Sequence, residues 1–482
     1  MLEAVRRTIG DEYVETAPVS DGDDGNTGIN GKNVGMYRPR AVHGIVRPTT
    51  VEQVRDVLRL FDDPGRGCGL QVVSTGRNWG LGSREPARDD AVVLDLGGLD
   101  RIRGIDLDRG WAVVEPGVTQ GRLAAELAGT DRMLNVTASS AHTSVVGNGV
   151  DRGVGLRQQR VDDLVGLEVV LPGGELVRVG WWPEDDRSTA VYPHGLGPGL
   201  APLFSQSDLG VVTAAAVRLL PRPEAQRVIR LSFGRDHLVA AVDLMRRWVA
   251  NGLVGGVLKI YDVVSAEFYG GRVGEFLAHL CVDGTERSVA AVSEVIADEA
   301  AASGLFSAVH HAAASPADGD VVVRMVENAY AGDPSSNDAM LEATLGRPAP
   351  EVDEHGLGWL FFLPMVPFAG ESVARAHALL ERIHEETGVR AGCTVNALSG
   401  DVIDFVVTFK FRRDSVEAKR AHGALDRAYE LFSAAGFIPY RLDVDHAEWV
   451  DRLSPDPGAR ALARRLKGWL DPNGAIASGR YA

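Results

Sequence analysis

The chain has 482 residues, of which 45% are hydrophobic and 24% charged, so a globular protein with more than one domain is expected. Its formal net charge of -16 excludes nucleic acid as a partner, because the phosphates would be repelled. The 3 cysteines lie far apart and the 12 histidines show no metal-ligand spacing, so neither a disulfide framework nor a metal site is expected.

The first residues carry charges where a signal peptide needs an apolar run, and no segment approaches the roughly 18 apolar residues of a membrane span. A cytoplasmic protein without a membrane partner is therefore expected. Residues 21–32 are similar to a calcium loop, but Gly25 and Lys32 stand where oxygen ligands are needed. We interpret this segment as a solvated loop.

The first half of the chain mixes short strands with short helices. A strand near residues 43–47 precedes a helix that Thr50 can cap, with apolar residues at helical spacing from Val51 to Phe61. Pro172, Gly173 and Gly174 separate two apolar runs and predict a β-hairpin. This part lacks the steady strand–helix alternation of a parallel sheet, which favours an α+β fold.

The second half, from about residue 226, alternates long amphipathic helices with apolar strands. Helices are expected at residues 236–252, 286–304, 371–388 and 415–436, and strands at 357–366 and 402–411. This pattern predicts a second domain in which helices cover one face of a sheet. A last helix is expected at residues 458–471, followed by a short tail.

Two glycine-rich segments are candidates for a cofactor site. In "STGRNWGLGS", Ser74–Ser83, three glycines allow backbone N–H groups to approach anionic oxygens, and Arg77 can add a charge-assisted contact. The second segment, "VGNGVDRGVG", residues 146–155, has little side-chain bulk and suits close approach to a large flat ligand. Ordinary tight turns remain the alternative for both segments.

These segments, together with "AVVEPGVTQGRL", "LFSQSDLGVVT", "GFIPYRLD" and "LDPNGAIASGRY", occur in an order that resembles the flavoprotein family of vanillyl-alcohol oxidase and 4-cresol methylhydroxylase. The resemblance extends from about His43 to Tyr481. It implies an α+β fold with a two-part FAD-binding domain over residues 1–225 and a cap domain over residues 226–436. Residues 437–482 would return to the FAD-binding domain.

The resemblance also implies bound FAD and hydride transfer from a substrate carbon to flavin N5. By analogy, the residues expected to contact FAD are Ser74, Thr75, Gly76, Arg77, Asn78, Trp79, Gly80, Leu81, Gly82, Ser83, Pro116, Gly117, Val118, Ser139, Ser140, Val145, Gly147, Asn148, Gly149, Val211, Val212 and Arg480. Relatives attach the flavin through a cap-domain histidine or tyrosine. Here that position falls on Trp359, and His355 is out of register, so the FAD is expected to be non-covalent. Trp359 packs near the flavin or in the cap core.

The sequence departs from the phenol-oxidising members at the substrate site. Those members bind a phenolate with two tyrosines and an arginine, whereas one tyrosine position here is Leu81, which cannot donate a hydrogen bond. The other two positions match Tyr440 and Arg441, which bind substrate or form a structural pair in which Arg441 meets Asp443 or Asp445. The residues expected to contact substrate are Leu81, Trp359, Phe361, Asp404, Tyr440 and Arg441.

Several residues are candidates for the catalytic base. Asp404 in an apolar cap strand could accept a hydroxyl proton, and His142 is a second candidate. Asp162 and Asp163 follow the second glycine-rich segment, where relatives carry an acid, or they cap the following strand.

We predict an FAD-dependent enzyme of the alcohol oxidase or dehydrogenase type that acts on a small, secondary-metabolite or sugar-like molecule. The alternatives are an oxidase of a para-substituted phenol and a flavin-binding protein without redox turnover. The small-molecule substrate is the expected partner, and a homodimer is left open.

Overall fold

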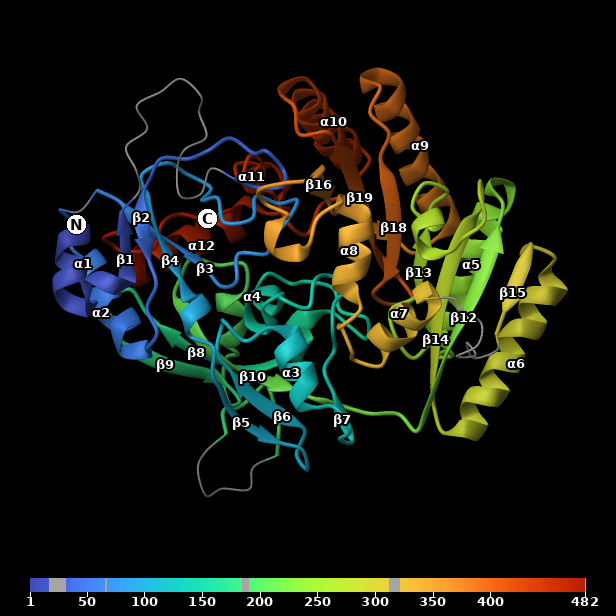
Figure 1. The fold of residues 1–482 in the computed structure, drawn as a ribbon, viewed down its shortest axis with the longest axis horizontal. Helices are drawn as coiled ribbons and strands as arrows, with labels where there is room; N and C mark the ends of the chain where they lie inside the picture. Colours follow the sequence, from blue (N-terminus) through green and yellow to red (C-terminus); the bar gives the residue numbers. More distant parts are fainter. Residues whose placement is uncertain (17–31, 66, 184–189, 312–320, 482) are drawn as a thin grey trace.

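The computed structural model describes residues 1–16, 32–65, 67–183, 190–311 and 321–481, and residues 21–31 of the segment similar to a calcium loop lie outside them. Two small sheets lie on one side of the molecule and one large sheet with long helices lies on the other (Figure 1). This arrangement is the predicted α+β fold. No helix of the described residues is both long and apolar enough to span a bilayer.

The first small sheet has the strand order β1-β2-β4-β3, in which β2 and β3 both run parallel to β4. Its elements are α1 (Leu2–Ile9), β1 (Val14–Thr16), β2 (Val42–Val46), α2 (Val51–Phe61), β3 (Gly69–Val73) and β4 (Ala91–Asp95). The predicted cap of α2 is confirmed, because Thr50 accepts from the backbone N–H of Gln53 and the Gln53 side chain closes the capping box. The glycine-rich segment Ser74–Ser83 therefore starts where β3 ends.

The second small sheet is antiparallel and has the order β5-β6-β10-β8-β9. The elements of this region are β5 (Ile102–Asp106), β6 (Trp111–Val114), α3 (Gln120–Glu126), β7 (Arg132–Met133), α4 (Val145–Val150), β8 (Leu164–Val170), β9 (Leu176–Gly180), β10 (Val211–Arg218) and β11 (Leu220–Pro221). Strands β8 and β9 form the predicted hairpin. The second glycine-rich segment contains α4, and Ser144 caps this short helix by accepting from the N–H of Gly147.

The large sheet, the cap sheet, has the order β15-β12-β14-β13-β18-β19-β16, with β17 also paired to β19, and every pair is antiparallel. Its strands are β12 (Ala225–Phe233), β13 (Lys259–Tyr261), β14 (Phe276–Gly284), β15 (Ala308–His310), β16 (Gly358–Phe362), β17 (Met365–Pro367), β18 (Gly392–Ala397) and β19 (Val402–Phe411). The helices of this region are α5 (Leu238–Ala250), α6 (Glu286–Ser303), α7 (Val321–Tyr330), α8 (Asn337–Leu345), α9 (Gly370–Thr387) and α10 (Ser415–Ala434).

The two faces of the cap sheet contact different parts of the protein. Alternate residues such as Ile260, Val395 and Phe405 pack with α5, α6, α9 and α10 in the largest hydrophobic core, as the amphipathic pattern predicts. On the opposite face, Val228 and Cys281 pack with residues of the second small sheet and its connections. This face therefore looks toward the small sheets, and Tyr330 of α7 packs against it as well.

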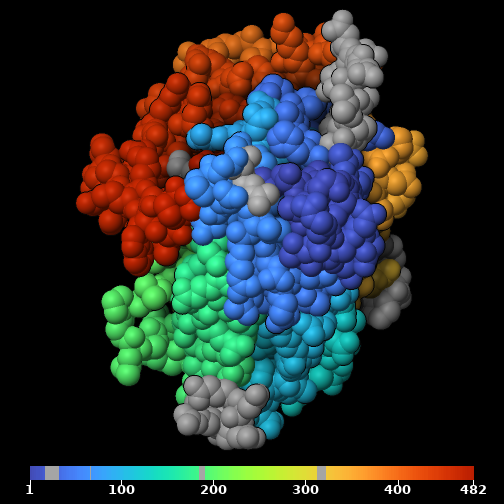
Figure 2. All heavy atoms as spheres, turned by 90° about the vertical axis from the view of Figure 1, so that its left-hand side faces the viewer, coloured from blue at the N-terminus to red at the C-terminus, as the bar shows by residue number. Residues whose placement is uncertain are grey.

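The C-terminal segment returns to the small sheets, as the resemblance implied. After α11 (Trp449–Leu453), helix α12 (Pro457–Leu470) packs two leucines against the second small-sheet core, and Ile476 bridges to Leu70 of β3. Figure 2 shows this segment in red beside the blue and green parts of the surface. We propose the domain division at residues 225 and 436, because the strands before 225 and those of the cap sheet pair in separate sheets.

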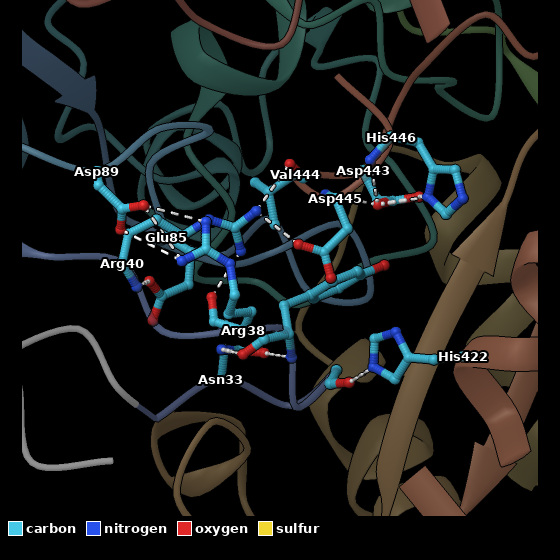
Figure 3. Close-up of polar contacts among 12 residues, drawn as sticks. Asn33, Arg38, Arg40, Glu85, Asp89, His422, Asp443, Val444, Asp445 and His446 are labelled. Atoms are coloured by element: carbon cyan, nitrogen blue, oxygen red, sulfur yellow. Dashed lines mark hydrogen bonds and ion pairs between the residues drawn. The ribbon is translucent and has the colours of Figure 1, made fainter. Parts of the chain in front are cut away.

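A cluster of polar residues connects the C-terminal segment to the residues that immediately precede β2 (Figure 3). Arg40 donates to the backbone oxygen of Val444 at 3.1 Å and to the Asp445 carboxylate at 2.5 Å. His446 Nδ1 lies 2.9 Å from Asp443 Oδ2, and its Nε2 lies 3.2 Å from Asp426 Oδ1. Burial would lower the pKa of His446, but the hydrogen bonds to Asp426 and Asp443 outweigh burial and raise this pKa to about 9.

The His446 pair makes the stability of the protein depend on pH. Since the pKa of His446 is higher in the folded than in the unfolded chain, its contribution is complete below about pH 6.5 and is lost as the pH rises to about 9. We expect the difference in unfolding free energy between wild type and His446→Asn to shrink by on the order of 2 kcal/mol over that range. Denaturant titrations at pH 6, 7.5 and 9 measure it.

The exposed His355 provides the control, and His355→Asn should change the unfolding free energy little at any of these pH values. A pH-independent difference for His446→Asn would contradict the assigned ion pair.

Candidate active site

The main cavity has a volume of about 260 Å³ and lies where the glycine-rich loop, α4 and the C-terminal tail meet. The loop after β3 and the start of α4 form two of its walls, and the tail residues Arg480 and Tyr481 form another. Backbone groups of several chain segments thus face one space, with little side-chain bulk between them. This is the geometry expected around a large cofactor.

Half of the residues expected to contact FAD line this cavity. They are Ser74, Thr75, Gly76, Arg77, Asn78, Ser83, Pro116, Gly147, Asn148, Val212 and Arg480. The cavity walls also include residues that the sequence did not single out, among them Glu85, Thr143, Ser144, Asp151, Phe204, Gln206, Ile476 and Tyr481. The glycine-rich loop is therefore part of a built site and not an isolated turn.

The other predicted contacts do not line the cavity, and many serve the packing around it. They are Trp79, Gly80, Leu81, Gly82, Gly117, Val118, Ser139, Ser140, Val145, Gly149 and Val211. Val118 and Val145 are fully buried in the second small-sheet core, and Val211 is buried in the core of the first. Leu81 is 2% exposed, so it is a buried apolar residue.

The described side chains of the cavity fit a phosphate-bearing and hydroxyl-bearing cofactor. Four of its lining residues carry a buried polar atom that lacks a hydrogen-bond partner within the described chain, namely Arg77 Nε, Glu85 Oε1, Asn148 Oδ1 and Asp208 Oδ2, of which only the last has an ion pair, with Lys467. Such atoms normally find a partner in water or a ligand. Gly76 has φ +69°, a conformation that favours glycine. A Cβ on Gly147 would lie 2.2 Å from Ser74 Oγ, so a side chain at that position would displace Ser74.

Asp353, in the segment that precedes β16, fixes the glycine-rich loop. Its carboxylate accepts from Trp79 Nε1 at 3.0 Å, from Ser83 Oγ at 2.5 Å and from the backbone N–H of Val34 at 3.0 Å. The side chain of Trp79 thus points toward the cap-domain segment, which explains its absence from the cavity wall. Sequence reasoning missed Asp353 because its partners lie 270 or more residues earlier.

Asp151, at the end of α4, is the central charge of the cavity. Arg441 donates to its carboxylate, Arg480 Nη2 donates at 3.1 Å and the Tyr481 hydroxyl at 3.1 Å. Burial disfavours the charged form, but Arg441 and Arg480 outweigh it and hold the pKa of Asp151 below its usual value. Arg441 Nη2 also donates to Asn78 Oδ1 at 2.8 Å, which connects the cluster to the loop.

The alternative pairing of Arg441 with Asp443 or Asp445 is wrong. Asp443 instead accepts from His446, and Asp445 accepts from Arg40. Among the acids in and just after the second glycine-rich segment, the one that lines the cavity is Asp151. Asp163 is 1% exposed and accepts from Asn135 and Gln158, outside the cavity walls. Asp162 does not line the cavity either.

Tyr440 connects the cavity to the cap sheet. It precedes Arg441, and its hydroxyl lies 3.5 Å from Oδ2 of Asp404 on β19. Asn396 on β18 donates to the same oxygen at 3.3 Å, and Lys259 on β13 donates to Asn396 Oδ1 at 2.6 Å. Burial raises the pKa of Asp404 to about 7.

The remaining sequence candidates lie in different surroundings. His142 is exposed and does not line the cavity, which argues against a catalytic role. Trp359 and Phe361 alternate on β16, with ring centroids 4.4 Å apart, and Trp359 packs against a small cluster that includes Trp79. Phe361 contacts the loop directly, since its N–H donates to the oxygen of Gly80 at 3.0 Å.

Comparison with known proteins agrees with this site. A family model described as an FAD binding domain matches residues 42–180. The chain is 27% identical to 1'-carboxy-chondrochloren decarboxylase of Chondromyces crocatus, over 100% of this chain and 96% of the relative. It is 26% identical to the 4-cresol dehydrogenase [hydroxylating] flavoprotein subunit of Pseudomonas putida, over 90% and 87% of the two chains.

The chain is an FAD-dependent oxidoreductase, and it is similar to 4-cresol methylhydroxylase and related flavoproteins, in agreement with the resemblance seen in the sequence. A crystal structure of p-cresol methylhydroxylase with substrate bound superimposes with a TM-score of 0.83, covering 100% of this chain and 96% of the other at 23% identity. That superposition supports the α+β fold. Whether the flavin is covalent and whether the protein is a homodimer stay predictions. In the described residues, no group of three or more His, Cys, Asp or Glu side chains is arranged to hold a metal ion.

The hydrogen bonds of the Asp353 carboxylate predict that its removal destabilises the protein. Asp353→Ala leaves three donors of the loop region without their acceptor, so we expect the unfolding free energy to fall by about 2–3 kcal/mol. FAD affinity should fall as well, because Ser83 lines the cavity. Denaturant unfolding and flavin-fluorescence titration measure the two effects.

The neighbouring Glu354 is a matched control, because its side chain is 55% exposed and lies 3.6 Å from Lys32. Glu354→Ala should change stability by no more than about 0.5 kcal/mol and leave FAD affinity intact. Wild-type stability and affinity in Asp353→Ala would show that the loop does not depend on this carboxylate.

Proposed function

We propose that the protein oxidises a C–OH group of a small, secondary-metabolite or sugar-like alcohol to a carbonyl. The pairing of Arg441 with Asp151, together with a buried leucine at position 81, is the observation that supports an alcohol over a phenol. The Asp151 carboxylate already balances the charge of Arg441, and the Nε and Nη2 donors bond Asp151 and Asn78, so this guanidinium attracts a phenolate less strongly. A leucine side chain donates nothing, so a neutral hydroxyl fits the site better.

Different residues of the chain would bind the cofactor and accept the substrate proton. The loop Ser74–Asn78, the start of α4 and Arg480 would hold the cofactor. FAD, when bound, supplies the two-electron acceptor for the hydride that leaves the substrate carbon. Asp404 accepts the proton of the substrate hydroxyl as the C–H bond breaks and the carbonyl forms.

Two properties favour Asp404 over Asp151 as the proton acceptor. Its Oδ1 is buried without a hydrogen-bond partner in the described part of the chain, so it is available to a substrate hydroxyl. Its pKa of about 7 suits a general base near neutral pH. Asp151 is stabilised as a carboxylate by two arginines, which makes it a weaker base and suits it to fixing Arg441.

A para-substituted phenol is the second candidate substrate. It is favoured by the similarity to 4-cresol dehydrogenase over 90% of the chain and by the match of Tyr440 and Arg441 to the phenolate-binding positions. The similarity to a decarboxylase over the whole chain shows that related sequences carry other reactions as well. Substrate tests therefore have to compare an alcohol with a phenol directly.

The alcohol reading predicts which compounds reduce the flavin. In anaerobic mixing, 1,4-benzenedimethanol should bleach the visible flavin absorbance, and 4-cresol should do so more slowly. The reduction rate should rise with pH through about 7, because Asp404 accepts a proton only when it is ionised. Asp404→Asn should slow reduction by about 100-fold and remove this rise.

Reduction by 4-cresol alone would support the phenol candidate instead. Protein that binds FAD but is reduced by neither class would be a flavin-binding protein without this redox turnover. Unchanged rates and an unchanged pH profile in Asp404→Asn would exclude Asp404 as the base.

The flavin linkage is tested separately. The position at which relatives attach the flavin falls on Trp359. Its indole packs beside Phe361 and cannot form the covalent bond to the flavin. We therefore expect acid precipitation of the holoenzyme to release all of the yellow colour into the supernatant. Colour that remains in the washed pellet would demonstrate a covalent link and would call for another attaching residue.

A further inference from the structure

A row of directly paired polar residues crosses the cap sheet. Arg230 of β12 stands opposite His279 of β14, which stands opposite Lys259 of β13. Lys259 in turn pairs with Asn396 of β18, and Asn396 pairs with Asp404 of β19. Directly paired residues of antiparallel strands project from the same face, so these side chains form one line.

This row lies on the face of the cap sheet that looks toward the small sheets, the face against which Tyr330 of α7 packs. The residues next to its members, such as Ile260, Ala278 and Val395, pack under the helices, and successive side chains alternate between faces. At the β19 end the row reaches Tyr440, the neighbour of the cavity-lining Arg441. The row therefore extends from the candidate active site along the inner face of the cap domain.

Lys259 has an unusual environment for a lysine. It is 8% exposed, and its amino group bonds the neutral amide oxygen of Asn396. Within the described residues, no carboxylate oxygen lies within 4.0 Å of its Nζ. Buried lysines are normally paired, because removing an ammonium from water is costly. Burial accordingly lowers the pKa of Lys259 to about 8, against the opposing effect of Asp404.

His279, the cross-strand neighbour of Lys259, also has unmet hydrogen-bonding capacity. It is 1% exposed, and neither of its ring nitrogens has a partner in the described part of the chain. Burial, with Arg230 and Lys259 nearby, lowers its pKa to about 3, so the ring is neutral and offers one N–H donor and one acceptor. Lys259 and His279 are thus direct cross-strand neighbours that can each donate a hydrogen bond.

We propose that Lys259 and His279 bind a carboxylate of the substrate, which makes the substrate an alcohol that carries a carboxylate group. This inference rests on the proposed function, in which Asp404 takes the hydroxyl proton at the other end of the row. The backbones of β13 and β19 are two strand spacings apart, about 10 Å. A small hydroxy acid can span the distance between the two ends, because the Lys259 side chain already reaches Asn396.

The charges of the row disfavour the other kinds of substrate tail. A cationic tail would be repelled by Lys259 and Arg230. An apolar tail would leave the ring nitrogens of His279 buried without partners and the ammonium of Lys259 without a counter-charge, and both cost free energy. A carboxylate supplies the counter-charge for Lys259 and an acceptor for the N–H of His279.

The test uses two alcohols that differ only in charge, namely 4-(hydroxymethyl)benzoate and neutral 1,4-benzenedimethanol. Anaerobic flavin reduction in the wild-type holoenzyme should be more efficient with the benzoate by at least about tenfold. Lys259→Met keeps the length of the side chain and removes the charge. This variant should lose the preference for the benzoate, measured as the ratio of the two reduction efficiencies, because an effect transmitted through Asn396 to Asp404 changes both alcohols alike.

Lys410→Met is the matched control, because Lys410 lies on β19 six residues from Asp404, with its amino group over the Phe268 ring. It should retain the wild-type preference. FAD content and thermal unfolding are measured for both variants, and Lys259→Met should bind FAD normally because Lys259 does not line the cavity. His279→Phe provides an independent variant that should also weaken the preference.

Equal efficiency with both alcohols in the wild type, or an equal loss for both in Lys259→Met, would overturn the carboxylate site. If neither compound reduces the flavin, perturbation of the flavin spectrum reports their binding. Binding of the benzoate to wild type but not to Lys259→Met would then keep this site and overturn alcohol oxidation. Absence of benzoate binding to the wild type would overturn the site itself.

Discussion

The carboxylate of Asp151 is the charge around which the candidate active site is assembled. Its two arginine partners come from the segment after the cap domain and from the C-terminal tail, 290 and 329 residues later in the chain. A buried carboxylate without these partners would be strongly destabilising, and so would the two guanidinium groups without the carboxylate. The ion pairs of Arg441 and Arg480 with Asp151 thus hold the segment that carries Tyr440 and the C-terminal tail against α4.

This neutralisation shapes the chemistry that the cavity can support. Arg441 is the cation that a phenolate would need, but the Asp151 carboxylate already balances it, and Asn78 occupies another of its donors. The exchange of a tyrosine for Leu81 removes a second donor from the same region. On the cap sheet, Asp404 and His279 have buried polar atoms without partners in the described residues, and the amino group of Lys259 bonds a neutral amide.

Local patterns predicted the fold well because their causes are local. Thr50 and Gln53 are three residues apart, and the turn at Pro172–Gly174 joins adjacent strands, so both features can be recognised from a few letters. The glycine-rich loop was recognised for the same reason. The structural alternative for Arg441 paired it with the nearest acids along the chain, whereas the folded protein uses those acids for Arg40 and His446.

The partners of Asp151 and Asp353 could not be predicted because the fold, not the sequence, makes them neighbours. In the sequence, Asp151 and Asp353 are ordinary acids in polar stretches. Their partners lie hundreds of positions away along the chain and become neighbours only in the folded protein. The same holds for the row on the cap sheet. Lys259, His279 and Asn396 each stand in an unremarkable apolar strand, and only the pairing of three strands places them side by side.

The cap sheet therefore has to meet two requirements with one strand register. The side chains next to the row must reach the helix-covered core, and the row itself must face the small sheets. A slip of β13 by one residue would bury Lys259 among the helices and turn Ile260 toward the active site. The burial of Ile260 in the core is thus what presents Lys259 to the site, so the packing energy of the cap domain also fixes the position of its polar groups.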